Sequence, residues 1–265
     1  MANVEHINPE TIPPPIANGY THVVKIGPWV YIAGQVGGKD GVLDPDAAVQ
    51  ADIVYTKMKL AMESVGGGLE DLVATTTYVT DADNGQKVRA VRSKFFGDNP
   101  PASTFIEIQQ LARKEILLEI EAVGYLTKDA DQEGDTMADV QRSQPKGMSP
   151  NNNRYSHVVK IGPWVYIAGQ TAANEDGDVV GIGDPKAQVD QVFKNLATAV
   201  ESVGGKLTDI IKTTVYVVGT DHMDAIREAR VGKFGDKPPT STLTVISSLA
   251  RPEFLLEIEA VAYVG

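Results

Sequence analysis

The sequence predicts two tandem domains of the α+β class, each with one sheet and two helices on one face. Residues 20–35 and 155–170 both read Y(T/S)HVVKIGPWVYIAGQ and differ at a single position. The heptapeptide LLEIEAV also occurs twice, at 117–123 and 255–261. A unit of about 138 residues is too long for a solenoid repeat, so the chain contains two copies of one complete domain.

Hydrophobic periodicity gives the order of elements within each copy. Residues 21–33 are apolar and β-branched on both sides of Gly27-Pro28, which predicts a hairpin whose second strand ends at Gly34. Apolar residues in 49–65 recur at three- and four-residue spacing, which predicts an amphipathic helix. Three glycines then end this helix. The first copy is predicted as strands 21–26 and 29–33, helix 49–65, strand 72–79, helix 86–96, and strands 103–108 and 117–125.

The second copy repeats this β-β-α-β-α-β-β order. Its elements are predicted as strands 156–161 and 164–168, helix 189–203, strand 210–218, helix 223–234, and strands 241–246 and 255–264. We place domain 1 at residues 1–127 and domain 2 at 154–265. Residues 128–153 are rich in polar residues and glycine, and we expect a linker whose last part leads into domain 2.

Composition excludes several classes of function. The net charge of −11 opposes binding to nucleic acid and to anionic membrane surfaces. The chain has no cysteine, which excludes disulfides and thiol chemistry, and its four histidines lack metal-ligand spacing. We expect no metal and no cofactor. The first residues do not resemble a secretory signal and no apolar run could span a membrane, so we expect a cytoplasmic location.

The last strand of each copy carries two carboxylates on one face. In the first copy Leu118, Ile120 and Ala122 share the face that packs under the helices, whereas Glu119 and Glu121 point the other way. A sheet face that mixes apolar residues with carboxylates is neither an ordinary core nor an ordinary wet surface. We therefore expect another domain to cover this face and to leave pockets at the seam.

The motifs together resemble the RidA/YjgF (RutC) family of imine and enamine deaminases. They are a tyrosine before a hairpin ending in AGQ, a TTVYV-like strand, a PPxST strand and a terminal LxEIEAV strand, and they occur in this order in both copies. The resemblance implies the chorismate-mutase-like α+β fold. It also implies trimers of domains, with an inner barrel of sheets and sites in the clefts between neighbouring domains.

The resemblance also implies the site residues. The water-positioning glutamate of the family corresponds to Glu119 and Glu257, which we expect to be catalytic. A carboxylate in a partly dry cleft can shuttle protons because desolvation raises its pKa. The expected substrate-binding residues are the pocket tyrosine, the glycine of the AGQ element and the residues on the face of the PPxST strand that lines the cleft. They are Tyr20, Gly34, Ser103 and Phe105 in the first copy and Tyr155, Gly169, Ser241 and Leu243 in the second.

One departure from the family pattern concerns the substrate. The deaminases carry an arginine in the PPxST stretch that binds the substrate carboxylate, and Ser103 and Ser241 stand at this position. Arg113 and Arg251 follow in the next turn. A serine hydroxyl cannot neutralise a carboxylate, so we expect a substrate other than a simple 2-aminoacrylate.

Three hypotheses remain open at this point. The first is a deaminase that hydrolyses a small enamine or imine to a carbonyl compound and ammonia. The second is a non-catalytic protein that binds a small molecule or a partner on the same scaffold. The third is a lyase or hydrolase acting on a cyclic or aromatic catabolic intermediate, because one fold hosts many chemistries. For each of them we expect a homo-oligomer, most simply a homotrimer of tandem chains that forms a pseudo-hexamer of domains.

Overall fold

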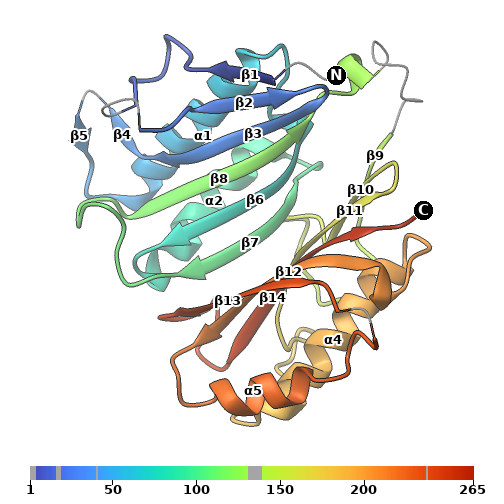
Figure 1. The fold of residues 1–265 in the computed structure, drawn as a ribbon. Helices are drawn as coiled ribbons and strands as arrows, with labels where there is room; N and C mark the ends of the chain where they lie inside the picture. The colour runs from blue at the N-terminus through green and yellow to red at the C-terminus, as the bar shows by residue number, and fades with distance from the viewer. Residues whose placement is uncertain (1–3, 16–18, 40, 131–138, 237) are drawn as a thin grey trace.

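Two α+β domains make up the chain, each a six-stranded sheet with two main helices on one face (Figure 1). This computed structural model describes residues 4–15, 19–39, 41–130, 139–236 and 238–265. The expected fold class is confirmed. Within the described part of the chain, no helix is long and apolar enough to cross a membrane.

The sheet of domain 1 has the strand order β1-β2-β3-β8-β6-β7. Only β6 and β7 pair in parallel, and the other neighbours are antiparallel. A two-stranded sheet, β4-β5, lies beside it. The elements are β1 Val4–Ile7, β2 Val23–Ile26, β3 Trp29–Val36, β4 Gly38–Lys39, β5 Val42–Leu43, α1 Ala47–Glu63, β6 Leu72–Val79, α2 Gly85–Phe96, β7 Ala102–Glu107 and β8 Leu118–Tyr125.

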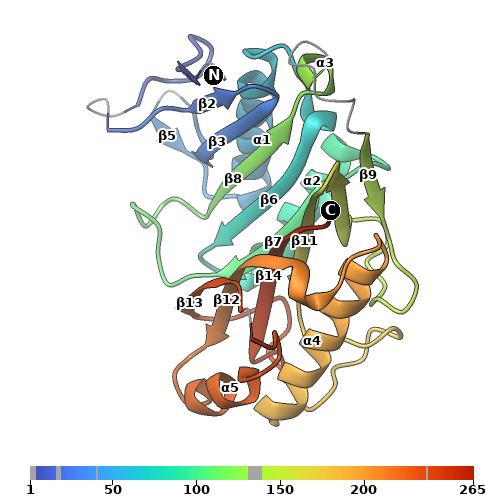
Figure 2. The same ribbon diagram turned by 45° about the vertical axis from the view of Figure 1, so that its right-hand side comes forward.

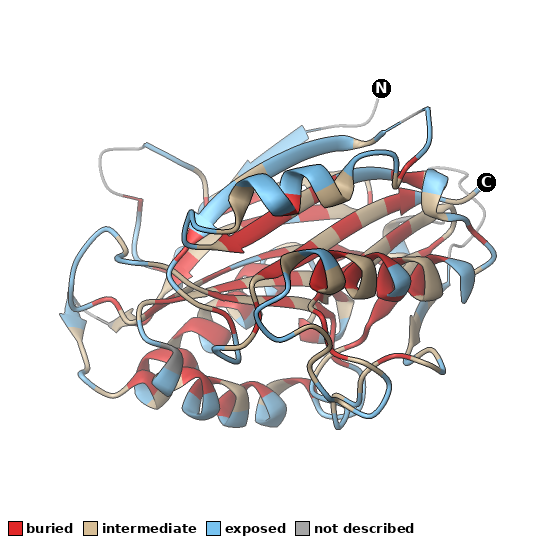
Figure 3. Ribbon diagram, turned by 90° about the horizontal axis from the view of Figure 1, so that it is seen from below, coloured by how far each residue is buried: buried red, intermediate tan, exposed pale blue. Residues whose placement is uncertain are grey.

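Domain 2 repeats this topology in the order β13-β12-β14-β11-β10-β9, again with one parallel pair, β12 with β13. Its elements are β9 Val140–Ser143, β10 Val158–Ile161, β11 Trp164–Gln170, α4 Pro185–Glu201, β12 Ile210–Val218, α5 Met223–Arg230, β13 Thr240–Ile246 and β14 Leu256–Tyr263. In both domains the helices cover the apolar side of the sheet and expose their outer faces, as Figure 3 shows. Leu118 and Ile120 are fully buried there, as the strand alternation predicts.

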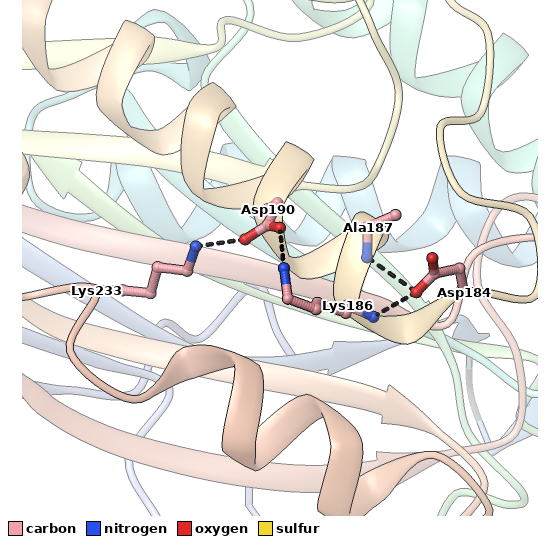
Figure 4. A network of polar contacts seen from close by, with 5 residues as sticks. All are labelled: Asp184, Lys186, Ala187, Asp190 and Lys233. Atoms are coloured by element: carbon pink, nitrogen blue, oxygen red, sulfur yellow. Dashed lines mark hydrogen bonds and ion pairs between the residues drawn. The ribbon is translucent and has the colours of Figure 1, made fainter.

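Helix ends follow local chemistry. Asp46 and Asp184 are the N-caps of α1 and α4, and each side-chain carboxylate accepts a hydrogen bond from a backbone N–H of the first turn. Lys186 and Lys233 both contact Asp190, which ties α4 to the segment after α5 (Figure 4). Helix α5 ends at Arg230, four residues before the predicted Phe234, because the chain turns at Gly232 with a φ of +76°.

Gly34 does not end its strand as predicted. Strand β3 continues to Val36, and its pairing with β8 shifts register between Ile32 and Gln35. The equivalent shift in β11 lies between Ile167 and Gln170. Each repeated glycine therefore sits in a β-bulge, a device that re-aims side chains and is frequent beside active sites.

The segment 128–153 is not only a polar linker. It contains β9, the edge strand of the second sheet, and β1 is the matching sixth strand of the first sheet. Strand β9 pairs with β10, whose backbone groups would otherwise lack partners on that side. Arg142 on β9 also donates hydrogen bonds to the carbonyl oxygens of Glu70 and Leu72 in domain 1, at 2.6 and 2.9 Å. The short helix α3, Thr127–Ala130, opens this segment.

The two sheets meet at a seam that runs along β7, the edge strand of domain 1. Strand β7 lies beside β11 of domain 2 (Figure 2). The Ser156 N–H donates to the Pro101 carbonyl at 3.1 Å, and Glu107 exchanges backbone hydrogen bonds with the 247–248 segment. An apolar cluster formed by both domains fills the seam, with Val73, Ala102, Val159 and Ala168 among its members. Domain 2 therefore covers part of the mixed sheet face of domain 1, but Glu121 on that face is exposed and Glu119 is only half-buried.

Ser156 is the residue at which the two sixteen-residue repeats differ, and it forms part of the seam. Its buried hydroxyl donates to the Pro100 carbonyl at 2.7 Å. We predict that Ser156→Ala lowers the free energy of unfolding by about 1–2 kcal/mol, because the buried carbonyl loses its donor. Thr21→Ala at the matching position of domain 1 is the control. Urea unfolding of both variants tests this, and equal losses would contradict the role of Ser156.

Candidate functional site

A cavity of about 400 Å³ lies between the two domains. Strand β7 of domain 1 contributes Ser103 and Phe105 to its lining. Domain 2 contributes Tyr155, which precedes β10, Gly169 on β11 and Glu257 on β14. The cavity therefore brings together five of the ten predicted site residues, taken from both domains.

Glu257 lies directly against Gly169. A Cβ built on Gly169 would come within 1.8 Å of the Glu257 Oε1 atom, so any larger residue would displace the carboxyl group from this position. The bulge in β11 and the glycine at it thus make the space that the carboxyl group occupies. This explains in physical terms why glycine stands at this position in both copies.

Burial changes the acidity of Glu257. The residue is 4% exposed, and burial together with the nearby Glu259 carboxylate raises its pKa to about 8. The backbone N–H of Phe105, across the seam, opposes this shift by hydrogen bonding to the carboxylate. Glu257 is therefore mostly protonated near pH 7 and can act both as a proton donor and, after ionisation, as a proton acceptor.

A histidine and a glutamine hold the segment that leads to Tyr155. His157 Nε2 lies 2.9 Å from the Ser149 carbonyl, and Gln170 Nε2 lies 3.4 Å from His157 Nδ1. The amide donates to Nδ1, so the Nε2 atom carries the proton. The tyrosine ring stacks edge-on against the imidazole at 5.0 Å. Burial raises the pKa of Tyr155 to about 12, so its hydroxyl remains a hydrogen-bond donor.

The matching residues of domain 1 form a separate, open group. Gly34 again faces its glutamate, since a Cβ there would lie 1.9 Å from Glu119 Oε1. The pKa of Glu119 is raised by burial and by Glu121, but the residue is only half-buried. Tyr20 is 46% exposed. The residues of domain 1 repeat those around Glu257. They lack, however, a covering strand such as the one that closes the cavity over Glu257.

Ser241 and Leu243 lie on β13, the edge strand of domain 2, and not in the cavity. Ser241 is exposed and accepts a hydrogen bond from Arg230 Nη2 at 2.9 Å. Five predicted residues (Tyr20, Gly34, Glu119, Ser241 and Leu243) thus form two half-sites that this chain does not bring together.

Of the arginines in the cavity, sequence reasoning named Arg251 and missed Arg89, Arg92 and Arg154. Arg89 and Arg92 on α2, Arg154 and Arg251 all line it. The absence of arginine from β7 therefore does not leave the cavity without guanidinium groups. A signal was present in the sequence, because Arg89 and Arg92 recur as Arg227 and Arg230 at the same spacing from the PPxST motif.

These features define a class of protein with paired α+β domains and a small cavity built at their seam. The family model described as Endoribonuclease L-PSP matches the chain twice, over residues 11–126 and 147–264. The chain belongs to this family and contains two copies of its domain. The resemblance to the RidA/YjgF family predicted from the sequence is confirmed.

Single-domain relatives match one half of the chain. A RutC family protein of Pyrococcus abyssi is 33% identical over 120 residues, which cover 45% of this chain and 90% of the relative. A RutC family protein of Pyrococcus horikoshii is 34% identical over 119 residues, with the same coverage. Among solved structures, a chorismatase is similar over 91% of this chain and 77% of its own, with a TM-score of 0.66 and 17% identity. This last likeness concerns the fold alone.

The raised pKa of Glu257 predicts how stability depends on pH. The folded state favours the protonated carboxyl. The contribution of Glu257 to the free energy of unfolding is therefore fully present below pH 4.5 and is lost as the pH rises to about 8. Glu257→Gln removes this dependence. We predict that the stability of the variant relative to the wild type increases between pH 5 and 8, by at most about 1.4 kcal/mol per pH unit.

Urea unfolding at several pH values measures this difference. Glu119→Gln is the matched control and should show a smaller pH-dependent difference, because Glu119 is only half-buried. If the stability of Glu257→Gln relative to the wild type is the same at pH 5 and pH 8, the carboxyl is not buried in its protonated form.

Proposed function

We propose that the chain hydrolyses a small imine or enamine in the cavity between its domains, with Glu257 as the acid–base group. The observation that carries this proposal is a buried carboxyl group with a pKa of about 8, set against Gly169 in a cavity of about 400 Å³. Membership of the RutC-type family supports the same reaction class. The products are a carbonyl compound and ammonia.

The chemistry requires one group that both gives and takes a proton. The protonated Glu257 donates its proton to the imine nitrogen, which makes the C=N carbon more electrophilic. The resulting carboxylate accepts a proton from water as the water oxygen forms a bond to this carbon. Glu257, protonated again, then gives its proton to the carbinolamine nitrogen, and the C–N bond breaks with its electrons moving to nitrogen so that ammonia leaves. The carboxylate accepts the hydroxyl proton as the C=O bond forms, which restores the protonated acid.

Neighbouring residues prepare this carboxyl for both steps. The Phe105 N–H stabilises the ionised form, and burial together with the Glu259 carboxylate favours the neutral form, so neither form is strongly disfavoured near pH 8. The Tyr155 hydroxyl lines the same cavity and can donate a hydrogen bond to a polar substrate. A substrate in the cavity therefore faces the Tyr155 hydroxyl and the Glu257 carboxyl group from domain 2, and strand β7 from domain 1.

Two other functions are less well supported. The family description names an endoribonuclease, but the net charge of −11 opposes an RNA backbone and the cavity has the size of a small metabolite. A non-catalytic binder would need neither the close fit of Gly169 to Glu257 nor the raised pKa. Turnover measurements separate this second hypothesis from the first.

We predict that Glu257→Gln lowers the kcat for imine hydrolysis by at least 100-fold, because the amide cannot exchange a proton. The assay generates imines of amino-acid-derived and aromatic type in situ and measures ammonia release. Glu119→Gln, the same change in the open half-site, should retain at least half of the wild-type turnover. Turnover that survives Glu257→Gln, or an absence of turnover with bound ligand in the wild type, would contradict the deaminase.

The open half-sites support a proposal about assembly. Tyr20 and Glu119 on domain 1 and Ser241 on domain 2 would need another copy of the chain to meet. We retain a homotrimer as the assembled state and predict a solution mass of three times the chain mass of 28.4 kDa by light scattering. A mass of one chain at micromolar concentration would contradict it.

A further inference from the structure

The cavity between the domains carries a local excess of positive charge in an acidic chain. Four arginines line it, Arg89, Arg92, Arg154 and Arg251, against one lining carboxyl group, Glu257. Arg251 already has protein partners, because it contacts the Glu253 carboxylate at 3.5 Å and donates to the Gly177 carbonyl at 3.0 Å. The other three form no ion pair with any residue that the structure describes.

Arg92 is the most deeply placed of these three. It is 7% exposed, and its Nε atom is buried without a hydrogen-bond partner among the described residues. Its Nη2 atom donates a long hydrogen bond of 3.4 Å to the Pro101 carbonyl, and its guanidinium lies 5.2 Å from the Phe96 ring. A buried guanidinium without a counter-charge is costly, and an anion in the cavity would remove this cost.

Arg89 lies one helical turn before Arg92, on the same side of α2. Its guanidinium carbon stands 4.7 Å from the centre of the Phe105 ring, which fixes it at the cavity wall. Arg154 belongs to domain 2. Burial lowers the pKa of Arg89, and the positive charge of the nearby Arg154 lowers it further. Three guanidinium groups from both domains therefore converge on one space.

The repeated arginines of domain 2 show a different arrangement. Arg227 contacts Asp224 at 3.7 Å, and Arg230 donates to Ser241 at 2.9 Å. Neither lines the cavity. In domain 1, Ser103 instead accepts a hydrogen bond from Thr75 at 3.4 Å, which leaves Arg92 without a side-chain partner. The Nε atom of Arg230 is also buried without a partner among the described residues, so the two copies differ in that Arg230 donates to the serine of its own domain, whereas Arg92 lines the cavity.

We infer that the cavity takes a small dicarboxylate, with Arg92 and Arg89 holding one carboxylate and Arg154 holding the other. In this arrangement helix α2 supplies the guanidinium groups that β7 lacks. The further statement that this dicarboxylate is an imine or enamine rests on the proposed function. The sequence-based expectation of a substrate other than a simple 2-aminoacrylate followed from Ser103 and Ser241, and a dicarboxylate agrees with that expectation.

Binding of a carbonyl product analogue tests the charge requirement without turnover. We expect 2-oxoglutarate to bind at one site per chain and at least tenfold more tightly than 2-oxopentanoate, which has the same chain length and one carboxylate. Isothermal titration calorimetry at fixed ionic strength measures both affinities. Equal affinities, or no binding of 2-oxoglutarate, would overturn the inference.

Matched variants locate the binding. Arg92→Gln, Arg89→Gln and Arg154→Gln should each weaken binding of 2-oxoglutarate at least tenfold. Arg230→Gln and Arg227→Gln remove the same charge at the repeat positions outside the cavity and should change the affinity less than twofold. If Arg92→Gln does not fold, Arg154→Gln decides the matter, because Arg154 is exposed. Equal losses from both sets would show a general charge effect and overturn the assignment.

The outcome separates this inference from the proposed function. Tight, arginine-dependent binding of the dicarboxylate without hydrolysis of any imine supports the binding site and contradicts the deaminase. Hydrolysis of monocarboxylate imines without binding of 2-oxoglutarate supports the deaminase and contradicts the dicarboxylate site.

Discussion

The contact between the Glu257 carboxyl group and the backbone of Gly169 is the constraint on which the candidate site depends. A Cβ at residue 169 would overlap the carboxyl oxygen, so the glycine, the β-bulge and the glutamate form one unit. This unit exists in both domains, but only in domain 2 does a strand of the other domain cover it. The covering strand β7 raises the pKa of the carboxyl by excluding water and offers it the Phe105 N–H. The pKa values of both glutamates are raised, and the seam adds the deeper burial that only Glu257 has.

Much of the fold could be predicted because the sequence contains its patterns twice. The alternation in Leu118–Ala122 and the helical spacing in 49–65 are local signals, and local signals decide secondary structure here. The polar segment 128–153 shows where they fail. Strand β9 is short and polar, and it forms because β10 offers unpaired backbone groups, which no local pattern records. The ends of α5 and β3 differ from the prediction for a similar reason, since glycines allow a turn in one and a bulge in the other.

The candidate site was predictable in part. The resemblance supplied Tyr155, Gly169, Ser103, Phe105 and Glu257, and the structure brings them together. It could not tell which copy would be covered, because Glu119 and Glu257 have identical neighbours in the sequence. Arg89, Arg92 and Arg154 were missed for another reason. Arg92 lies on a helix whose polar residues resemble an ordinary solvent-exposed face, and only tertiary packing buries it. The charged groups of this site thus come from elements outside the sequence motifs by which the site was predicted.

Joining two copies in one chain also changes how the protein can evolve. In a ring of identical subunits, every substitution enters all of the sites at once, so a change that harms one harms all. In this chain Phe105 and Leu243 occupy the same repeat position but only one of them lines the cavity. A mutation at either position is inherited alone. Fusion therefore allows the two sets of duplicated residues to change independently of each other.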